Sequence, residues 1–179
     1  MQTLNRSIRS QGDFDGACFL YSLVNAVYCL TGRQIEADGW ARVVSEAYDA
    51  RDFLNGQIGT AKIDNLPSLL STLAMQYLRA LDQITHYDVE LVEGIKKVGD
   101  LQRTLSSKSV LLVDNGSHWF CLVDFYDDTA FAACSAALQD DPCNYSEMSS
   151  NRLRIIYNVS FPKKHLKFHK NRAFLISVQ

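Results

Sequence analysis

Residues 109–133, SVLLVDNGSHWFCLVDFYDDTAFAA, decide how this chain folds. The stretch consists of short runs rich in β-branched, aromatic and aliphatic residues, which is the composition of β-strands. Turn signals separate these runs, DNG at 114–116 and DD at 127–128. Because short turns join neighbouring antiparallel strands, the stretch predicts an antiparallel sheet in this part of the chain.

Further strands are expected on both sides of this stretch, and the residues before it are predicted to be mostly helical. The additional strands are expected at 86–92, 152–161 and 172–179. The helices are expected at 17–30, 38–54 and 65–81, with a short one near 99–107. Gly32 follows the first helix, Asp38 opens the second, and Pro67 lies just inside the third. Helices followed by antiparallel strands indicate an α+β fold, with N-terminal helices packed on a C-terminal antiparallel β-sheet.

The composition is that of an ordinary globular domain, with 47% hydrophobic and 21% charged residues among 179. No linker or repeat divides residues 1–179, so we expect a single domain. The formal net charge of −2 gives no reason to expect a nucleic-acid partner. No run approaches the ~20 apolar residues of a membrane span, so we expect no membrane association. The N-terminus lacks the apolar segment of a signal peptide, which favours a cytoplasmic protein or one exported without a cleavable signal.

The first of five cysteines, Cys18, lies where a loop becomes a helix, in the stretch QGDFDGACFLYSLVNA at 11–26. A helix N-terminus lowers the pKa of a thiol through its unpaired N–H groups and partial positive charge. A nucleophilic thiol also needs a base, and we assign this role to His118 because it begins a strand directly after a turn. The backbone N–H of Cys18 and the side-chain amide of Gln11 are suited to stabilise an oxyanion.

The blocks QGDFDGACFLYS at 11–22 and SHWF at 117–120 together resemble the papain-like cysteine peptidase superfamily. They are most similar to its small bacterial branch, which includes bacteriocin-leader peptidases and compact effector proteases and deamidases. The resemblance implies a papain-like fold, with Cys18 as nucleophile, His118 as general base and then acid, and Gln11 as oxyanion donor. One departure is Phe19, where such enzymes commonly have glycine. We expect this bulky ring to narrow the cleft or to alter substrate access.

The second departure concerns the residue that orients the histidine, which the family takes as Asp or Asn from the next strand. The corresponding stretch here is FAACSAA at 131–137, which contains neither. A two-residue turn at 127–128 would place residue 137 opposite His118. Ser135, two positions along on the same face, is therefore our candidate for the third catalytic residue. The alternatives are Cys134, Asp140 and Asp141.

The chemistry expected of this constellation is hydrolysis of an amide bond, with a peptide bond in a protein or peptide substrate favoured. Thiol, imidazole and water suffice for it, so no cofactor is expected. Glutamine deamidation and amide transfer use the same steps, and the sequence leaves them open. A catalytically inactive binding module is a further alternative, because Phe19 is bulky and no Asp or Asn stands in the third position. The oligomeric state is also left open.

Two other features compete with this interpretation. Cys134, Cys143, His165 and His169 include the H-x3-H spacing of zinc sites, but their C-x8-C spacing is wider than usual, so we expect no metal. The basic stretch KKHLKFHKNR at 163–172 is suited to an acidic partner, although such runs are usually solvated turns.

Overall fold

The computed structural model describes residues 17–32, 35–45, 67–81, 87–91, 95–106, 108–136, 157–169 and 173–178. The helices are α1 (Cys18–Thr31), α2 (Ala37–Ser45), α4 (Pro67–Leu81) and α5 (Val98–Thr104), with a 3-10 turn η1 (Lys163–His165). The strands are β1 (Tyr87–Leu91), β2 (Ser109–Asp114), β3 (Trp119–Tyr126), β4 (Thr129–Ala133), β5 (Val159–Pro162) and β6 (Ala173–Val178). Each predicted helix and strand has a counterpart in the described residues, but α5 ends at Thr104 and residues 157–158 of a predicted strand precede β5. Residues 46–54 of the predicted second helix and 152–156 of a predicted strand lie outside the described residues.

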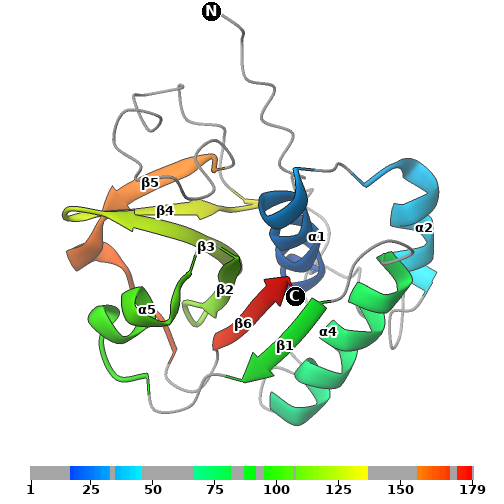
Figure 1. Cartoon of the computed structure of the whole chain (residues 1–179), viewed down its shortest axis with the longest axis horizontal. Helices are drawn as coiled ribbons and strands as arrows, with labels where there is room; N and C mark the ends of the chain where they lie inside the picture. Colours follow the sequence, from blue (N-terminus) through cyan, green and yellow to red (C-terminus); the bar gives the residue numbers. More distant parts are fainter. Residues whose placement is uncertain are drawn as a thin grey trace, which may run out of the picture.

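The strands form one antiparallel sheet in the order β1-β6-β2-β3-β4-β5. Helices α1, α2 and α4 lie on one side of this sheet, and α5 lies on the other (Figure 1). The α+β class and the packing of helices on an antiparallel sheet are therefore confirmed. The last strand, β6, pairs with β1 on one side and with β2 on the other, so the strand order departs from the chain order.

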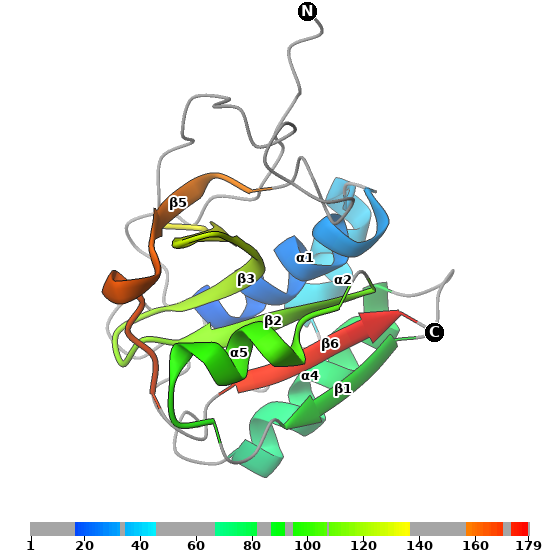
Figure 2. The ribbon, with the colours of Figure 1, turned by 60° about the vertical axis from the view of Figure 1, so that its left-hand side comes forward.

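Helix α1 is buried on nearly all sides, because it packs between the sheet and α4 (Figure 2). It ends at Gly32, whose φ of 69° is a left-handed conformation that favours glycine. The Gly32 N–H donates to the Tyr28 carbonyl at 2.8 Å and closes the last turn. Alternate residues of β3, Trp119, Cys121 and Val123, join α1 and α4 in the core on this face.

The opposite face of the sheet carries a second core cluster. Phe120 and Leu122, the intervening residues of β3, pack there with Leu101 of α5. From Trp119 to Val123 the alternation of β3 therefore assigns successive side chains to the two cores in turn. This division matters for the candidate site, because Cys18 packs against the first cluster and Cys134 against the second.

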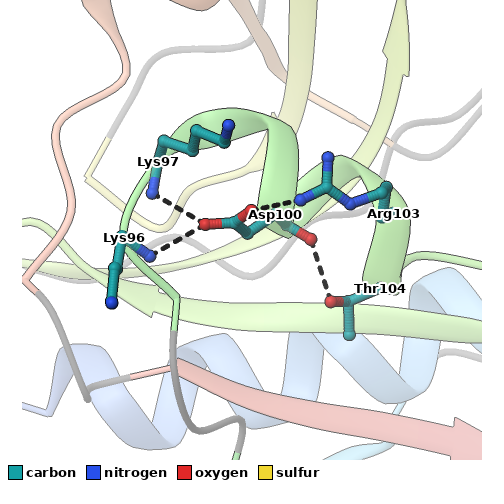
Figure 3. Close-up of polar contacts among 5 residues, drawn as sticks. All are labelled: Lys96, Lys97, Asp100, Arg103 and Thr104. Carbon is teal, nitrogen blue, oxygen red and sulfur yellow. Dashed lines mark hydrogen bonds and ion pairs between the residues drawn. The ribbon is translucent and has the colours of Figure 1, made fainter.

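Helix α5 is held at its N-terminal end by Asp100. One carboxylate oxygen of Asp100 accepts hydrogen bonds from the backbone N–H groups of Lys96 and Lys97, each at 3.0 Å (Figure 3). The other oxygen accepts a hydrogen bond from the guanidinium of Arg103, and Thr104 Oγ1 donates to the Asp100 carbonyl at 3.0 Å. The two backbone hydrogen bonds are the main reason that the pKa of Asp100 is lowered.

Strand β3 contains a register shift between Leu122 and Asp124. Beyond the shift, Tyr126 pairs with Thr129 across the two-residue turn that the sequence predicts. Before the shift, Cys121 pairs with Ala133, which is one residue earlier on β4 than an unbroken ladder would give. The extra residue on β3 makes a β-bulge. Because side chains alternate between the two faces, a shift of one residue changes which residues of β4 and its continuation share a face with the start of β3.

Candidate active site

Cys18 is the first residue of α1 and is half-buried. Within the described residues, no side chain caps this end of the helix, and its first turn contains no acidic residue. A helix N-terminus favours a thiolate at this position through its N–H groups and partial positive charge. Ser22 Oγ donates to the Cys18 carbonyl at 2.7 Å and fixes the turn that carries the thiol.

Phe19, the residue after Cys18, joins the helix start to the start of β3. Its ring is fully buried and meets the ring of Trp119 edge-on, with centroids 5.0 Å apart and planes inclined by 72°. Phe19 also packs against Phe174 of β6 at 6.1 Å. The expectation that this ring narrows a cleft is therefore wrong, because the ring fills the core beneath the helix start. The contact brings the residues that follow Cys18 and His118 side by side.

His118 is held at the end of the tight connection between β2 and β3. Its backbone N–H donates to Asn115 Oδ1 at 2.9 Å, and its carbonyl accepts from the Asn115 N–H at 3.1 Å. The imidazole is half-buried, and burial lowers the pKa of His118 from its ordinary value, with the charge of Asp114 opposing the shift. At neutral pH the ring is therefore mostly uncharged, which is the form that accepts a proton.

The imidazole contacts a thiol other than the one expected. Nε2 of His118 lies 3.4 Å from Sγ of Cys134. Within the described residues, the hydrogen bond of the ring goes to Cys134 and none joins it to Cys18. Cys18 instead packs against the core on the α1 side of the sheet.

The β-bulge explains why Cys134, and not Ser135, lies against the ring. In an unbroken ladder Ser135 would share a face with His118, but the shift moves the pairing by one residue. Extending the observed register places Cys134 opposite Phe120, on the face that His118 also occupies. Ser135 lies in the turn after β4 with only 2% of its surface exposed, and the ring contact of His118 goes to Cys134.

Asn158 holds Cys134 in place, and sequence reasoning missed this role. The Asn158 side chain accepts a hydrogen bond from the Cys134 N–H and donates one to its carbonyl, both at 2.7 Å. Asn158 is only 1% exposed, and its own N–H donates to the Ala132 carbonyl at 3.1 Å. The signal in the sequence is an amide side chain inside the apolar run at 152–161, where a strand is predicted.

The remaining predicted residues fall outside this cluster or outside the described residues. Gln11, Asp140, Asp141 and Cys143 lie in segments that the structure does not describe. The zinc alternative is not tested, because Cys143 is among the residues not described; within the described ranges no group of three metal ligands is assembled. His169 is on the surface, where its backbone N–H donates to the Asp114 carbonyl at 2.6 Å.

A cavity of about 350 Å³ opens beside His118 and Cys134. Its volume is at the lower end of the range of small-ligand sites. It lies over the second core cluster, on the face of the sheet opposite α1. A ligand in this cavity therefore contacts the histidine and the thiol beside it.

Comparisons with protein-family models, with curated proteins and with solved structures found no match for this chain. In the described part of the chain, no helix is both long and apolar enough to cross a bilayer.

Proposed function

We propose that the protein is a cysteine hydrolase of papain-like architecture that cleaves an amide bond, with Cys18 as nucleophile and His118 as general base and acid. The observation that carries the proposal is the edge-on contact of Phe19 with Trp119. The contact joins Phe19, the residue after Cys18, to Trp119, the residue after His118. A peptide bond is the favoured substrate, because thiol, imidazole and backbone donors suffice to cleave one.

The two ring nitrogens of His118 take different roles in this proposal. Nε2 lies 3.4 Å from the sulfur of Cys134. We assign the ring proton to Nε2, so that Nδ1 is the unprotonated nitrogen that takes the proton of Cys18. The lowered pKa of His118 keeps Nδ1 unprotonated at neutral pH until the thiol donates to it. Cys134 thus stands where the family has Asp or Asn, and Asn158 fixes it there.

In the reaction, the thiolate of Cys18 adds to the carbonyl carbon, and the backbone N–H of Cys18, with the amide of Gln11, stabilises the oxyanion. The imidazolium of His118 protonates the leaving nitrogen as the C–N bond breaks, which leaves a thioester. His118 then takes a proton from water, the hydroxide adds to the thioester, and the thiolate leaves and is reprotonated. Deamidation and transfer to another amine differ only in the substrate amide or in the acceptor.

A neutral thiol stabilises an imidazolium less than a carboxylate does. We therefore expect the thiolate–imidazolium pair to be weaker than in a triad that contains Asp. Replacing Cys134 by Asp should lower the apparent pKa of the Cys18 thiol further, whereas Cys134→Ala should raise it.

The test is the alkylation rate of each cysteine by iodoacetamide, measured by mass spectrometry over about pH 5–9, a range that contains the ordinary thiol pKa. We expect Cys18 to react with an apparent pKa well below ~8.5, and His118→Ala to raise it. The matched control is His169→Ala, which removes a histidine outside the cluster and should leave the profile unchanged. Cys29 and Cys121 are internal references, because both are buried and burial raises the pKa of the Cys121 thiol.

Two outcomes would contradict the proposal. If Cys134 is the thiol that reacts at low pH and depends on His118, the nucleophile is Cys134 and the role of Cys18 is wrong. If no thiol reacts at low pH, the site is inactive, and a binding module becomes the better interpretation.

A further inference from the structure

The cavity beside His118 has an apolar floor. Phe120, Val159, Phe161 and Leu166 form it, and the rings of Phe120 and Phe161 meet edge-on at 6.5 Å between centroids. Phe120 and Leu166 belong to the buried core, whereas Val159 and Phe161 are only partly covered. An apolar side chain entering the cavity would cover this exposed surface and remove it from water.

The rim of the same cavity is basic. Lys167 and His165 line it, and both are exposed. They belong to the stretch at 163–169 that follows β5, in which Lys163 and Lys164 are also basic. Lys163 already donates to Gln102 Oε1 at 3.1 Å and lies over the ring of Phe125, so its charge is directed away from the cavity. Within the described residues Lys167 forms no ion pair, so its ammonium is available to a ligand.

We infer that this cavity binds a peptide segment in which an apolar side chain, preferably aromatic, is followed directly by an acidic residue. The apolar side chain occupies the floor, and its acidic neighbour meets Lys167 at the rim. The inference goes beyond the proposed function, because His118 lines this cavity whereas Cys18 packs on the other face of the sheet. The binding itself requires no reaction.

The lining residues favour this occupant over others. Among the described residues that line the cavity none is acidic, so these residues do not repel a carboxylate and Lys167 attracts it. A metal ion is disfavoured because no three ligands converge in the described part of the chain. A volume of about 350 Å³ accommodates one large side chain with part of its backbone and is small for a folded partner.

The experiment is a titration of the ¹⁵N-labelled Cys18→Ala protein with unlabelled hexapeptides, following amide shifts around the cavity by NMR. The alanine variant binds without turnover. The probes are GSFDSG, GSADSG and GSFKSG. We expect GSFDSG to bind with shifts centred on Val159 and Lys167. GSADSG, which lacks the aromatic ring, should bind about thirtyfold more weakly than GSFDSG, as expected when a fully buried apolar side chain is lost. GSFKSG, in which lysine replaces the acidic residue, should bind about fivefold more weakly than GSFDSG.

Charge reversal at the rim provides the matched control. Lys167→Glu should weaken GSFDSG about fivefold and reverse the preference in favour of GSFKSG. Lys164→Glu changes the net charge equally but lies outside the cavity, and should leave both affinities within about twofold, since exposed charges at a distance are screened. Val159→Trp, which fills the cavity, should abolish binding; its thermal transition shows whether it has folded.

Equal affinity for the three peptides, or equal effects of the two charge reversals, would overturn the inference. Its failure is distinguishable from failure of the proposed function. If the peptides show this selectivity but Cys18 is unreactive in the alkylation experiment, the protein is a binding module with this specificity. If Cys18 is reactive and depends on His118 but the peptides show no selectivity, the protein is a hydrolase whose substrate is recognised elsewhere.

Discussion

Replacing Asn158 by alanine tests the link that holds Cys134 against the imidazole. The substitution leaves the Cys134 N–H and carbonyl without the two 2.7 Å hydrogen bonds that Asn158 gives them. Asn158 is 1% exposed, so water does not replace these bonds without entering the core. Each buried polar group left unpaired costs about 1–3 kcal/mol, so we expect the free energy of unfolding to fall by about 4 kcal/mol. For a chain of this size that corresponds to a Tm lower by about 8–16 °C.

The assay is thermal unfolding followed by circular dichroism, with urea unfolding to obtain the free energy. The control is Ser22→Ala, which removes a buried hydroxyl but leaves its acceptor, the Cys18 carbonyl, bonded within α1. It should cost about 1 kcal/mol or less. Asn158→Asp keeps the acceptor but turns the donor into a carboxylate facing the Cys134 carbonyl. It should be destabilised at neutral pH and recover partly when acid protonates the new side chain.

A loss of less than ~3 °C in Asn158→Ala, or an Asn158→Asp variant as stable as wild type at neutral pH, would refute the reasoning. Either result would mean that the backbone of Cys134 does not depend on Asn158. The orientation of the thiol toward His118 would then need another cause.

Three further predictions concern other parts of the molecule. Phe19→Ala removes a fully buried ring from the contact with Trp119 and should cost about 3–5 kcal/mol in urea unfolding, whereas Phe19→Leu should cost less. Asp100→Asn should lower the Tm at neutral pH, and because the pKa of Asp100 is lowered on folding, this difference should shrink as the pH falls below 3.8; a constant difference would contradict the role of its charge. Because burial lowers the pKa of His118, the unfolded chain takes up the proton first as the pH falls below 6.5, and stability should decrease there; His118→Gln should flatten this slope in a pH series of melts.

Local sequence patterns account for most of the described elements. Gly32 ends α1 where predicted, because its left-handed conformation closes the helix. The turn at 127–128 joins β3 and β4 with the predicted two residues. These features depend on neighbours in the chain, which is what a sequence pattern records.

The site itself depends on contacts that no local pattern records. The bulge in β3 brings Cys134, and not Ser135, to the face of His118. It lies beside Asp124, a buried acid whose carboxylate accepts the Phe125 N–H at 2.7 Å. Asn158 reaches Cys134 from a distant part of the chain, so only the folded sheet reveals the pair. The position of His118 after a turn was predicted correctly, but which thiol its ring contacts was not.

The position of β6 has a consequence for biosynthesis. Strands β1 and β2 are not neighbours, and each pairs with β6. While the ribosome is still translating the residues before 173, β1 has no partner in the sheet and one edge of β2 is open. A nascent chain in that state carries two unpaired edges capable of pairing with other chains. The sheet is completed only after residue 178 has emerged from the exit tunnel, so until then those edges are open to pairing with other chains.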